Sequence, residues 1–526
     1  MQKGAANTGI AREFRDIFQL GGVPAFNQYY YFGIFLWKWI YKGFYKAWHV
    51  IPCPTIANPK GTRELYRLNT AKAICAEMAS LVWGDQCTVN VSMNGRSADA
   101  DTPDPLNEFV QHVLGENALF EKMQESIEQA LALGGAAMKT WSDVMHDENG
   151  NEIEGTRKIK IGYAMADQFI PTAWDNARVK EGVFVSRIAK AGYYYTRLEW
   201  HRWNGLTYTI TNELYRSEMR RNETGTDQDI LGVRWPLADI YPELDEETVI
   251  PVSESLFTYW RTPIANNLDD NSPLGMSVYG NAMETLHALD ICYDSFVREF
   301  RLGRKRIIVP ARAVRSIVDP NTGALLRYFD ATDETYEALA SDSPDDLKIT
   351  DNSVELRVEE HISALNAFLS ILCLQMGFSA GSFTFDQHTG LKTATEVVSE
   401  NSKTYKTVKT IQNQIAPSLE HLVRNIIDVA ILYGMEWKGQ SIEKLAAGGY
   451  TVSVMFDDGI TQDRQTNINE GVMLVGAGLL SKYTFLTDKK YGQGLTPEEA
   501  EAELKRISEE GRMQAATVTN LFGGME

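Results

Sequence analysis

The segment Gly390-Leu391-Lys392-Thr393 comes closest to a phosphate-binding loop in this sequence. In a P-loop, a glycine stands directly before the lysine and a second glycine lies upstream, so that backbone N–H groups can surround a phosphate. Here Leu391 separates the glycine from the lysine, and the upstream position is Phe385. We therefore reject nucleotide hydrolysis at this segment.

Other patterns that could support catalysis are equally weak. Asp457-Asp458 could hold a metal after an apolar strand, but no further carboxylate stands at ligand spacing, so a turn is the preferred interpretation. The eight histidines show no HExxH or other paired ligand spacing, and Gly-x-Ser-x-Gly does not occur. The sequence predicts no catalytic site, no metal site and no cofactor, so we expect the protein not to be an enzyme.

Charge is unevenly distributed along the chain. The formal charge of −19 at pH 7 argues against a protein that binds nucleic acid generically and tightly. One stretch has six cations within fifteen residues, followed by eight anions against one cation, Lys348. The cations are Arg301, Arg304, Lys305, Arg306, Arg312 and Arg315, and the anions are Asp330, Asp333, Glu334, Glu337, Asp342, Asp345, Asp346 and Asp351. This stretch is either an ordinary solvated surface or a docking surface for adjacent copies or a partner.

Two long helical patterns flank the charged stretch. The first is expected from Pro273 to about Leu302, after an N-cap at Ser272 and before Gly303. We expect Asp294 and other polar residues to fall outside its apolar face. That face comprises Met276, Tyr279, Met283, Leu286, Tyr293, Phe296 and Phe300. The second pattern runs from Val358 to Met376 and ends at Gly377.

A glycine- and phenylalanine-containing loop follows, from Gly377 to Lys392 (GFSAGSFTFDQHTGLK). Long loops inside compact chains are usually functional, and a disordered surface loop is the alternative. Thr393-Ala394-Thr395-Glu396 then has the pattern of a capping box that opens a third helix, which could continue to Tyr433 with a kink at Pro417.

With 526 residues the chain should form more than one domain, and 44% apolar with 23% charged residues is typical of a folded soluble protein. Residues 61–145 are expected to be helical, around Leu65 to Leu81 and from Asn107 to Ala132, before a strand at Ala137–Ser142. Residues 155–262 are expected to form β-structure, with a hairpin at Asn204-Gly205. A strand from Tyr450 to Phe456 and a capped helix from Thr496 to about Glu510 follow.

The first 60 residues contain an aromatic run, Tyr29 to Trp37, followed by Lys38, Lys42 and Lys46. The lysines cut this run short of the roughly 20 apolar residues that a membrane span needs. An interfacial amphipathic helix is one alternative. Burial against another part of the protein or against a neighbouring subunit is the preferred interpretation. We expect no secretory signal, and five cysteines without a CxxC pair are expected to be buried and reduced.

The order of helix, insert, helix, glycine-containing loop and a helix opening "KTATEV" resembles the portal proteins of tailed bacteriophages. The resemblance is to portals of phages with long non-contractile tails, of the type first grouped around Listeria phages. Three further stretches fit the pattern: "TAKAICAEMASLVWGD", "ADQFIPTAWDN" and "FDDGITQDRQ" with "GAGLLSKYTF". The similarity covers about residues 60 to 510.

This resemblance implies an α+β, multi-domain portal fold. Its parts would be an N-terminal arm (1–60), a wing of helices and sheet (61–272), a first stem helix (273–303), a clip (304–356), a second stem helix (357–376), a tunnel loop (377–392), a long kinked helix with a wing strand (393–460), and a crown with a flexible tail (461–526).

The resemblance also implies a function without catalysis. A portal is a homo-oligomeric ring, a dodecamer in assembled phages, at one vertex of the capsid in the virion, and it is made in the bacterial cytoplasm. Double-stranded DNA passes through it without sequence-specific contact. It docks the terminase large subunit and then a head-tail adaptor, and it contacts major capsid and scaffold proteins, with no membrane partner. An acidic wall suits sliding, because it avoids the strong counterion-release binding that would stall DNA.

Site residues follow from the same resemblance. The tunnel loop would offer polar side chains to phosphates, and its phenylalanines would pack copy against copy. These residues are Phe378, Ser379, Ser382, Phe383, Thr384, Phe385, Gln387, His388 and Lys392. Lys403, Lys406 and Lys409 would face the channel or be ordinary exposed charges. Arg304, Lys305, Arg306, Arg312 and Arg315 would form the docking surface of the clip. The rival interpretations are a capsid scaffold or shell protein, a DNA-processing enzyme and a membrane-associated pore.

Overall fold

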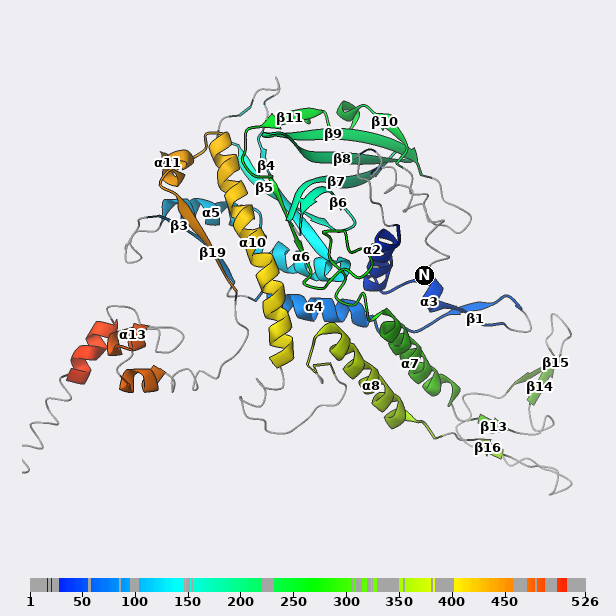
Figure 1. The fold of residues 1–526 in the computed structure, drawn as a ribbon. Coiled ribbons are helices and arrows are strands. Elements are labelled where there is room, and N and C mark those ends of the chain that lie inside the picture. The colour runs from blue at the N-terminus through cyan, green and yellow to red at the C-terminus, as the bar shows by residue number, and fades with distance from the viewer. Residues whose placement is uncertain are drawn as a thin grey trace, which may run out of the picture.

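In the computed structural model (Figure 1), helices and antiparallel sheets both contribute to the core, so the expected mixed α+β class is confirmed. The structure describes residues 28–54, 58–84, 87–94, 104–145, 152–153, 155–176, 178–219, 231–303, 306–308, 315–318, 325–328, 350–352, 355–379, 382–383, 402–456, 471–477, 480–487 and 499–508, with single residues 17, 20, 147 and 323.

The aromatic run lies on helix α2 (Gln28–Tyr41), inside the subunit. Tyr30, Ile34 and Trp37 are buried, and the Tyr30 hydroxyl donates to the carbonyl oxygen of Gly275 over 2.6 Å. The prediction of burial against another part of the chain is therefore confirmed. Within the described ranges, no helix is both long and apolar enough to cross a bilayer.

A helical layer follows, made of α4 (Thr70–Val82), α5 (Pro105–Glu116) and α6 (Leu119–Leu133). Asp104 caps α5, because its side chain accepts from the backbone N–H groups of Leu106 and Asn107. The single helix expected from Asn107 to Ala132 is wrong, since Ala118 adopts a φ of 47° and breaks it into two. The Asn117 side chain at the break bonds to Val113 and Ile159, which ties the turn to the neighbouring strand.

The expected helix over residues 61–69 is also wrong. Residues 62–64 form strand β2 (Thr62–Glu64), which pairs with β1 (Val50–Pro52), the strand that directly follows the short helix α3 (Lys46–His49). Asn69 has a φ of 54° and precedes the real helix start at Thr70. Backbone pairing with the nearby strand β1, which apolar periodicity does not report, decides the structure of this segment.

Two antiparallel sheets form the β-rich region expected from residues 155–262 (Figure 1). The first has the order β12-β4-β5, with β4 (Gly135–Asp143), β5 (Lys158–Met165) and β12 (Phe257–Arg261). The second has the order β10-β9-β8-β7-β6, with β11 on β9. Its strands are β6 (Phe169–Asp175), β7 (Arg178–Lys190), β8 (Tyr193–Asn204), β9 (Thr207–Glu218), β10 (Val233–Trp235) and β11 (Glu247–Ile250), with a 3-10 turn, η2 (Leu237–Asp239), after β10. The hairpin at Asn204-Gly205 is confirmed, with Gly205 at a φ of 63°.

A buried ionic network joins the two sheets. Lys139 on β4 and Arg197 on β8 both donate to Glu199 of β8, over 2.5 and 2.6 Å. His201 lies 3.0 Å from the other oxygen of Glu199, and its second nitrogen lies 2.6 Å from the Tyr208 hydroxyl. Burial alone would raise the pKa of the Glu199 carboxyl, but Lys139, His201 and Arg197 together hold it far below its usual range.

The chain then crosses the core without regular structure. Residues 273–279 are all buried, and the first long helix, α7 (Met283–Leu302), begins ten residues later than expected. Gly275 packs directly against Gly134, where a methyl group on either residue would collide with the carbonyl oxygen of the other. The Val278 N–H donates to Leu131 over 2.9 Å, and the Tyr279 hydroxyl donates to Trp37 over 2.8 Å. Met276 and Tyr279 are therefore core residues of this crossing and not of a helix face.

The second long helix, α8 (Val358–Met376), has the predicted bounds, and α7 and α8 lie side by side (Figure 1). The third, α10 (Ser402–Leu432), contains Pro417, and its expected start at residues 393–401 lies outside the described residues. Strand β19 (Tyr450–Met455) is close to the predicted span and pairs with β3 (Thr88–Met93), a segment expected to be helical. The fold thus joins two segments that lie more than 350 residues apart through one strand pair.

Smaller elements complete the described chain. They are β13 (Arg306–Ile308), β14 (Arg315–Val318), β15 (Leu325–Tyr328), β16 (Thr350–Asn352), β17 (Glu436–Trp437), β18 (Gln440–Ser441), α11 (Ile442–Ala446) and α13 (Lys482–Thr487). Residues 499–508 are helical as expected, and the expected cap at Thr496 lies outside the described residues. None of the five cysteines, all of which the structure describes, forms a disulfide; Cys75, Cys87 and Cys373 are buried, and Cys53 and Cys292 are half-buried.

We predict that Glu199→Gln destabilises the fold by about 3 kcal/mol, because Lys139 and Arg197 would lose a buried counter-charge. The free energy of unfolding by urea at pH 7 measures this. Glu247→Gln, an exposed change on β11, is the control and should have little effect. Because the folded-state pKa of Glu199 is lowered, its contribution is present above the unfolded pKa of about 4.3 and is lost as the pH falls below it. An equal loss of stability in both variants would contradict the network's role.

Candidate functional site

The most distinctive site is the pair of helices α7 and α8 with the loop base that follows them. One face of α7 carries two carboxylates a single turn apart, Asp290 and Asp294. Arg63 makes a bidentate pair with Asp294 over 2.8 and 2.7 Å, and the backbone N–H of Tyr66 donates to the same side chain over 3.1 Å. Asp290 accepts from the backbone N–H of Leu68 over 2.9 Å. The segment that contains β2 is therefore fastened along α7.

Asp294 is buried, which corrects the expectation that it falls outside the packed face. Burial raises the pKa of its carboxyl, but the Arg63 guanidinium and the Tyr66 N–H lower it to below the ordinary value. His49 lies 3.0 Å from Asp290, and Trp48 stacks on His287 with ring centroids 4.7 Å apart. Sequence periodicity missed these residues because a buried, paired aspartate looks like a surface aspartate in a helical pattern.

An ion pair holds α7 and α8 together at the end nearest the insert. Arg357, the residue before α8, donates to both oxygens of Glu299 over 3.0 and 2.9 Å. Phe296 contacts His361 with ring centroids 5.4 Å apart. The paired helices also present large apolar side chains to solvent. These are Ile291, Phe300 and Leu302 on α7 and Ile371 and Leu374 on α8, of which Leu374 is 70% exposed.

The base of the loop after α8 is fixed to α10. Gly377 ends α8 with a φ of 82°, as predicted, and its carbonyl oxygen accepts from the Thr407 hydroxyl over 2.7 Å. Ser379 and Thr404 are both buried and bond reciprocally: the Ser379 N–H donates to the Thr404 hydroxyl over 2.9 Å, and the Thr404 N–H donates to the Ser379 hydroxyl over 3.4 Å.

This geometry corrects two of the expected loop contacts. Phe378 is 2% exposed and packs edge-on against Phe383 inside the subunit, so it is a core residue and not a surface for a neighbouring copy. Ser379 is occupied by Thr404 and cannot reach a phosphate. Ser382 is exposed and donates to the Ser379 carbonyl, whereas Phe383 is partly buried. Thr384, Phe385, Gln387, His388 and Lys392 lie outside the described residues.

Lys403, Lys406 and Lys409 are exposed near the start of α10. Lys403 donates to the carbonyl oxygen of Leu374 over 3.1 Å, so it also caps the end of α8. Of the expected clip cations, Arg306 lies on β13 and Arg315 on β14, and Arg304, Lys305 and Arg312 lie outside the described residues. The structure therefore brings the lysines together with the loop base.

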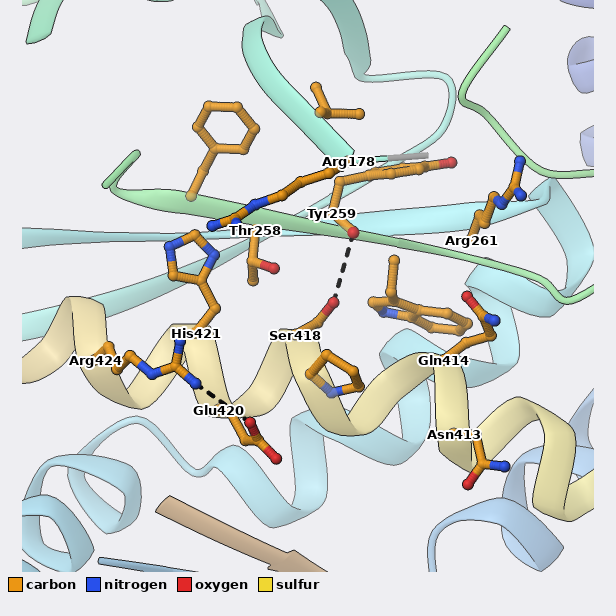
Figure 2. Close-up of a pocket in the computed structure, with 14 residues that line it drawn as sticks. Arg178, Thr258, Tyr259, Arg261, Asn413, Gln414, Ser418, Glu420, His421 and Arg424 are labelled. Atoms are coloured by element: carbon orange, nitrogen blue, oxygen red, sulfur yellow. Dashed lines mark hydrogen bonds and ion pairs between the residues drawn. The ribbon is translucent and has the colours of Figure 1, made fainter. Parts of the chain in front are cut away.

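The described residues also include a cavity of about 420 Å³ between β12 and α10 (Figure 2). Arg178, Arg261 and Arg424 line it together with polar side chains of α10. Within the described ranges, no group of three or more His, Cys, Asp or Glu side chains is placed to hold a metal ion.

We predict that Thr404→Val loosens the loop base, because the buried N–H of Ser379 would lose its acceptor. The loss should be about 1 to 2 kcal/mol of local stability, measured as faster amide hydrogen exchange over residues 377–383. Thr410→Val is the matched control, because Thr410 is exposed on the same helix and its hydroxyl donates to the carbonyl oxygen of Lys406, one turn earlier. Unchanged exchange at Ser379 would show that this hydrogen bond does not hold the loop.

Comparison with known proteins adds family information to this geometry. The family profile described as "Phage portal protein, SPP1 Gp6-like" matches residues 27–517. Among solved structures, the chain resembles one from the "Neck of empty GTA particle computed with C6 symmetry", with 12% sequence identity, a TM-score of 0.36, and coverage of 80% of this chain and 88% of that chain. A search of curated proteins gives no match. Because the family profile spans most of the sequence, the chain belongs to the SPP1 Gp6-like family of phage portal proteins.

Proposed function

We propose that this portal protein forms a ring, a dodecamer in the assembled particle, at one vertex of a phage capsid. Family membership over residues 27–517 is the observation that carries this proposal. The exposed apolar side chains on α7 and α8 support it, because such residues on paired helices are suited to contact with the next copy around a ring. We propose no catalytic step for this chain.

The ring would be the conduit for double-stranded DNA during packaging and ejection. The lysines at the start of α10 and the loop of residues 377–392 would touch phosphates weakly and without reading bases, which suits sliding. Ser382, Phe383, Thr384, Phe385, Gln387, His388 and Lys392 remain the proposed loop contacts, and Phe378 and Ser379 are removed from this set because they are buried. The acidic balance of the chain supports weak contact.

The remaining parts follow the same proposal. Residues 61–272 would be the wing, α7 and α8 the stem, residues 304–356 the clip, residues 393–460 the long helix and wing strand, and residues 461–526 the crown. The clip cations would dock first the terminase large subunit and then the head-tail adaptor. Contacts with major capsid and scaffold proteins would place the ring in the virion.

We predict that the purified wild-type protein forms rings with a central hole, seen by negative-stain electron microscopy. Leu374→Glu should abolish rings, because a charge would enter the contact between adjacent stems. Leu206→Glu is the control: Leu206 is 96% exposed at the hairpin tip between β8 and β9, and its replacement should leave rings unchanged. Closed shells in place of rings would instead support a capsid shell or scaffold protein.

We predict opposite effects for two phenylalanines of the same segment. Phe378→Ala should lower stability by about 3 kcal/mol, because it opens a cavity in the core. Phe385→Ala should keep stability and ring formation but reduce the DNA retained in packaging assays with terminase, by a factor of about 3 to 10, because each copy would lose one contact between its tunnel loop and that of the next copy. Normal packaging by Phe385→Ala would exclude the proposed tunnel-loop role of that residue.

A further inference from the structure

The cavity between β12 and α10 has an unusual chemical character for this acidic chain. Strand β12 is an edge strand of its sheet, and α10 contacts both β12 and its neighbour β4. Figure 2 shows Arg178 and His421 toward one end of the cavity and Arg261 and Gln414 toward the other, with the Ser418 hydroxyl directed at the Tyr259 carbonyl. Asn413, Gln414 and Pro417 are exposed at the α10 side, so the cavity is open to solvent there.

Positive charge in the cavity exceeds negative charge. Arg178 pairs with Glu254, and Arg424 pairs with Glu420, each over 3.3 Å. Arg261 also lines the cavity, and among the residues that the structure describes it has no ion-pair partner. Burial lowers the pKa of His421 to about 4 despite Glu254 at 3.0 Å, so its ring is neutral at pH 7. The cavity therefore keeps an uncompensated arginine in a chain of net charge −19.

A second, independent feature is a buried donor without an acceptor. Trp260 is 2% exposed and lines the cavity, and its ring N–H finds no acceptor in the described part of the chain. Buried N–H groups are normally paired, so an orphan donor at the wall of an open cavity suits an acceptor from outside the chain, either a water molecule or a group of a partner. Its neighbour Arg261 supplies a planar fork of donors that suits an oxygen anion.

The apolar residues that line the cavity favour a carboxylate side chain over a free phosphate ion. Phe257, Trp260 and Pro417 contribute apolar surface beside the arginines. A free, strongly hydrated phosphate would lose water there without gaining apolar contact. A glutamate or aspartate on a protein surface brings its own methylene groups and backbone to the same walls.

We propose that this cavity is a docking site for carboxylate side chains of a second copy of the chain. The inference rests on the proposed function, because a ring places a neighbouring copy beside each subunit. A chain with 70 acidic residues against 51 basic ones offers many such carboxylates. One ion pair per subunit, repeated around a closed ring, would favour the correct register between copies.

The first test is Arg261→Gln in the full-length protein, with ring dissociation measured by sedimentation velocity from 50 to 500 mM NaCl. Because copies of the variant should bind each other more weakly, we expect its rings to dissociate at a protein concentration at least about tenfold higher than that for the wild type. This concentration should also depend less on salt in the variant than in the wild type. Arg234→Gln is the matched control, because Arg234 is an exposed arginine on β10 whose ion pair with Glu246 is long, at 3.9 Å. Thermal unfolding of both variants checks that each still folds.

The second test identifies the partner group directly. The Arg261→Lys variant, mixed as light and ¹⁵N-labelled copies and treated with a zero-length carbodiimide, should give an amide crosslink from position 261 to a carboxylate of another copy. A crosslink only within one copy, or none, would overturn the proposal. A second result would also overturn the proposal. If inorganic phosphate or a short DNA duplex raised the melting temperature of the wild type but not that of Arg261→Gln, the site would be one for phosphate.

The outcomes separate this inference from the proposed function. Rings that Arg261→Gln leaves equally stable, without an intercopy crosslink, would refute the docking site and leave the portal ring intact. A wild-type protein that stays monomeric under all conditions would contradict both.

Discussion

The close approach of Gly134 and Gly275 is the constraint on which the rest of the fold depends. Helix α6 ends and β4 begins at Gly134, and the segment that leads into α7 passes over it at Gly275. The Thr262 N–H, after β12, donates to Gly134 over 3.1 Å, and Tyr30 of α2 donates to Gly275. Because neither glycine carries a side chain, the junction of α6 and β4, the end of β12, the segment before α7 and helix α2 can meet at one point. The direction in which α7 leaves the sheet region follows from this crossing.

From that crossing outward, the subunit is stiffened by polar contacts that are mostly buried. Asp290 and Asp294 hold the segment that contains β2 along α7. The hydrogen bonds between Ser379 and Thr404 hold the loop base on α10. These contacts position surfaces and do not assemble a reactive group. Such an arrangement suits a family of proteins whose work depends on the shape of an assembly.

Sequence patterns predicted the elements whose stability is local. Helix α8 ends at Gly377 as expected, because the sequence shows both the apolar periodicity and a glycine, the residue that most easily adopts the left-handed conformation after a helix. The hairpin at Asn204-Gly205 was equally clear. The failures lie where distant backbone overrides local preference. Residues 273–282 carry helical spacing but cross the core, and residues 88–93 pair with β19, more than 350 residues away. Periodicity does not reveal such partners.

The amino-acid sequence alone determined the class of fold, the paired long helices, the absence of a recognisable catalytic motif and the family. Those conclusions depend on composition, periodicity and the order of motifs, which are properties of neighbouring residues. Only the tertiary structure decided that Phe378 is core, that Asp294 is buried and paired, and that Arg261 and Trp260 share an open cavity. Burial and the pairing of charges depend on which distant segments pack against a residue, and that information exists only once the chain has folded.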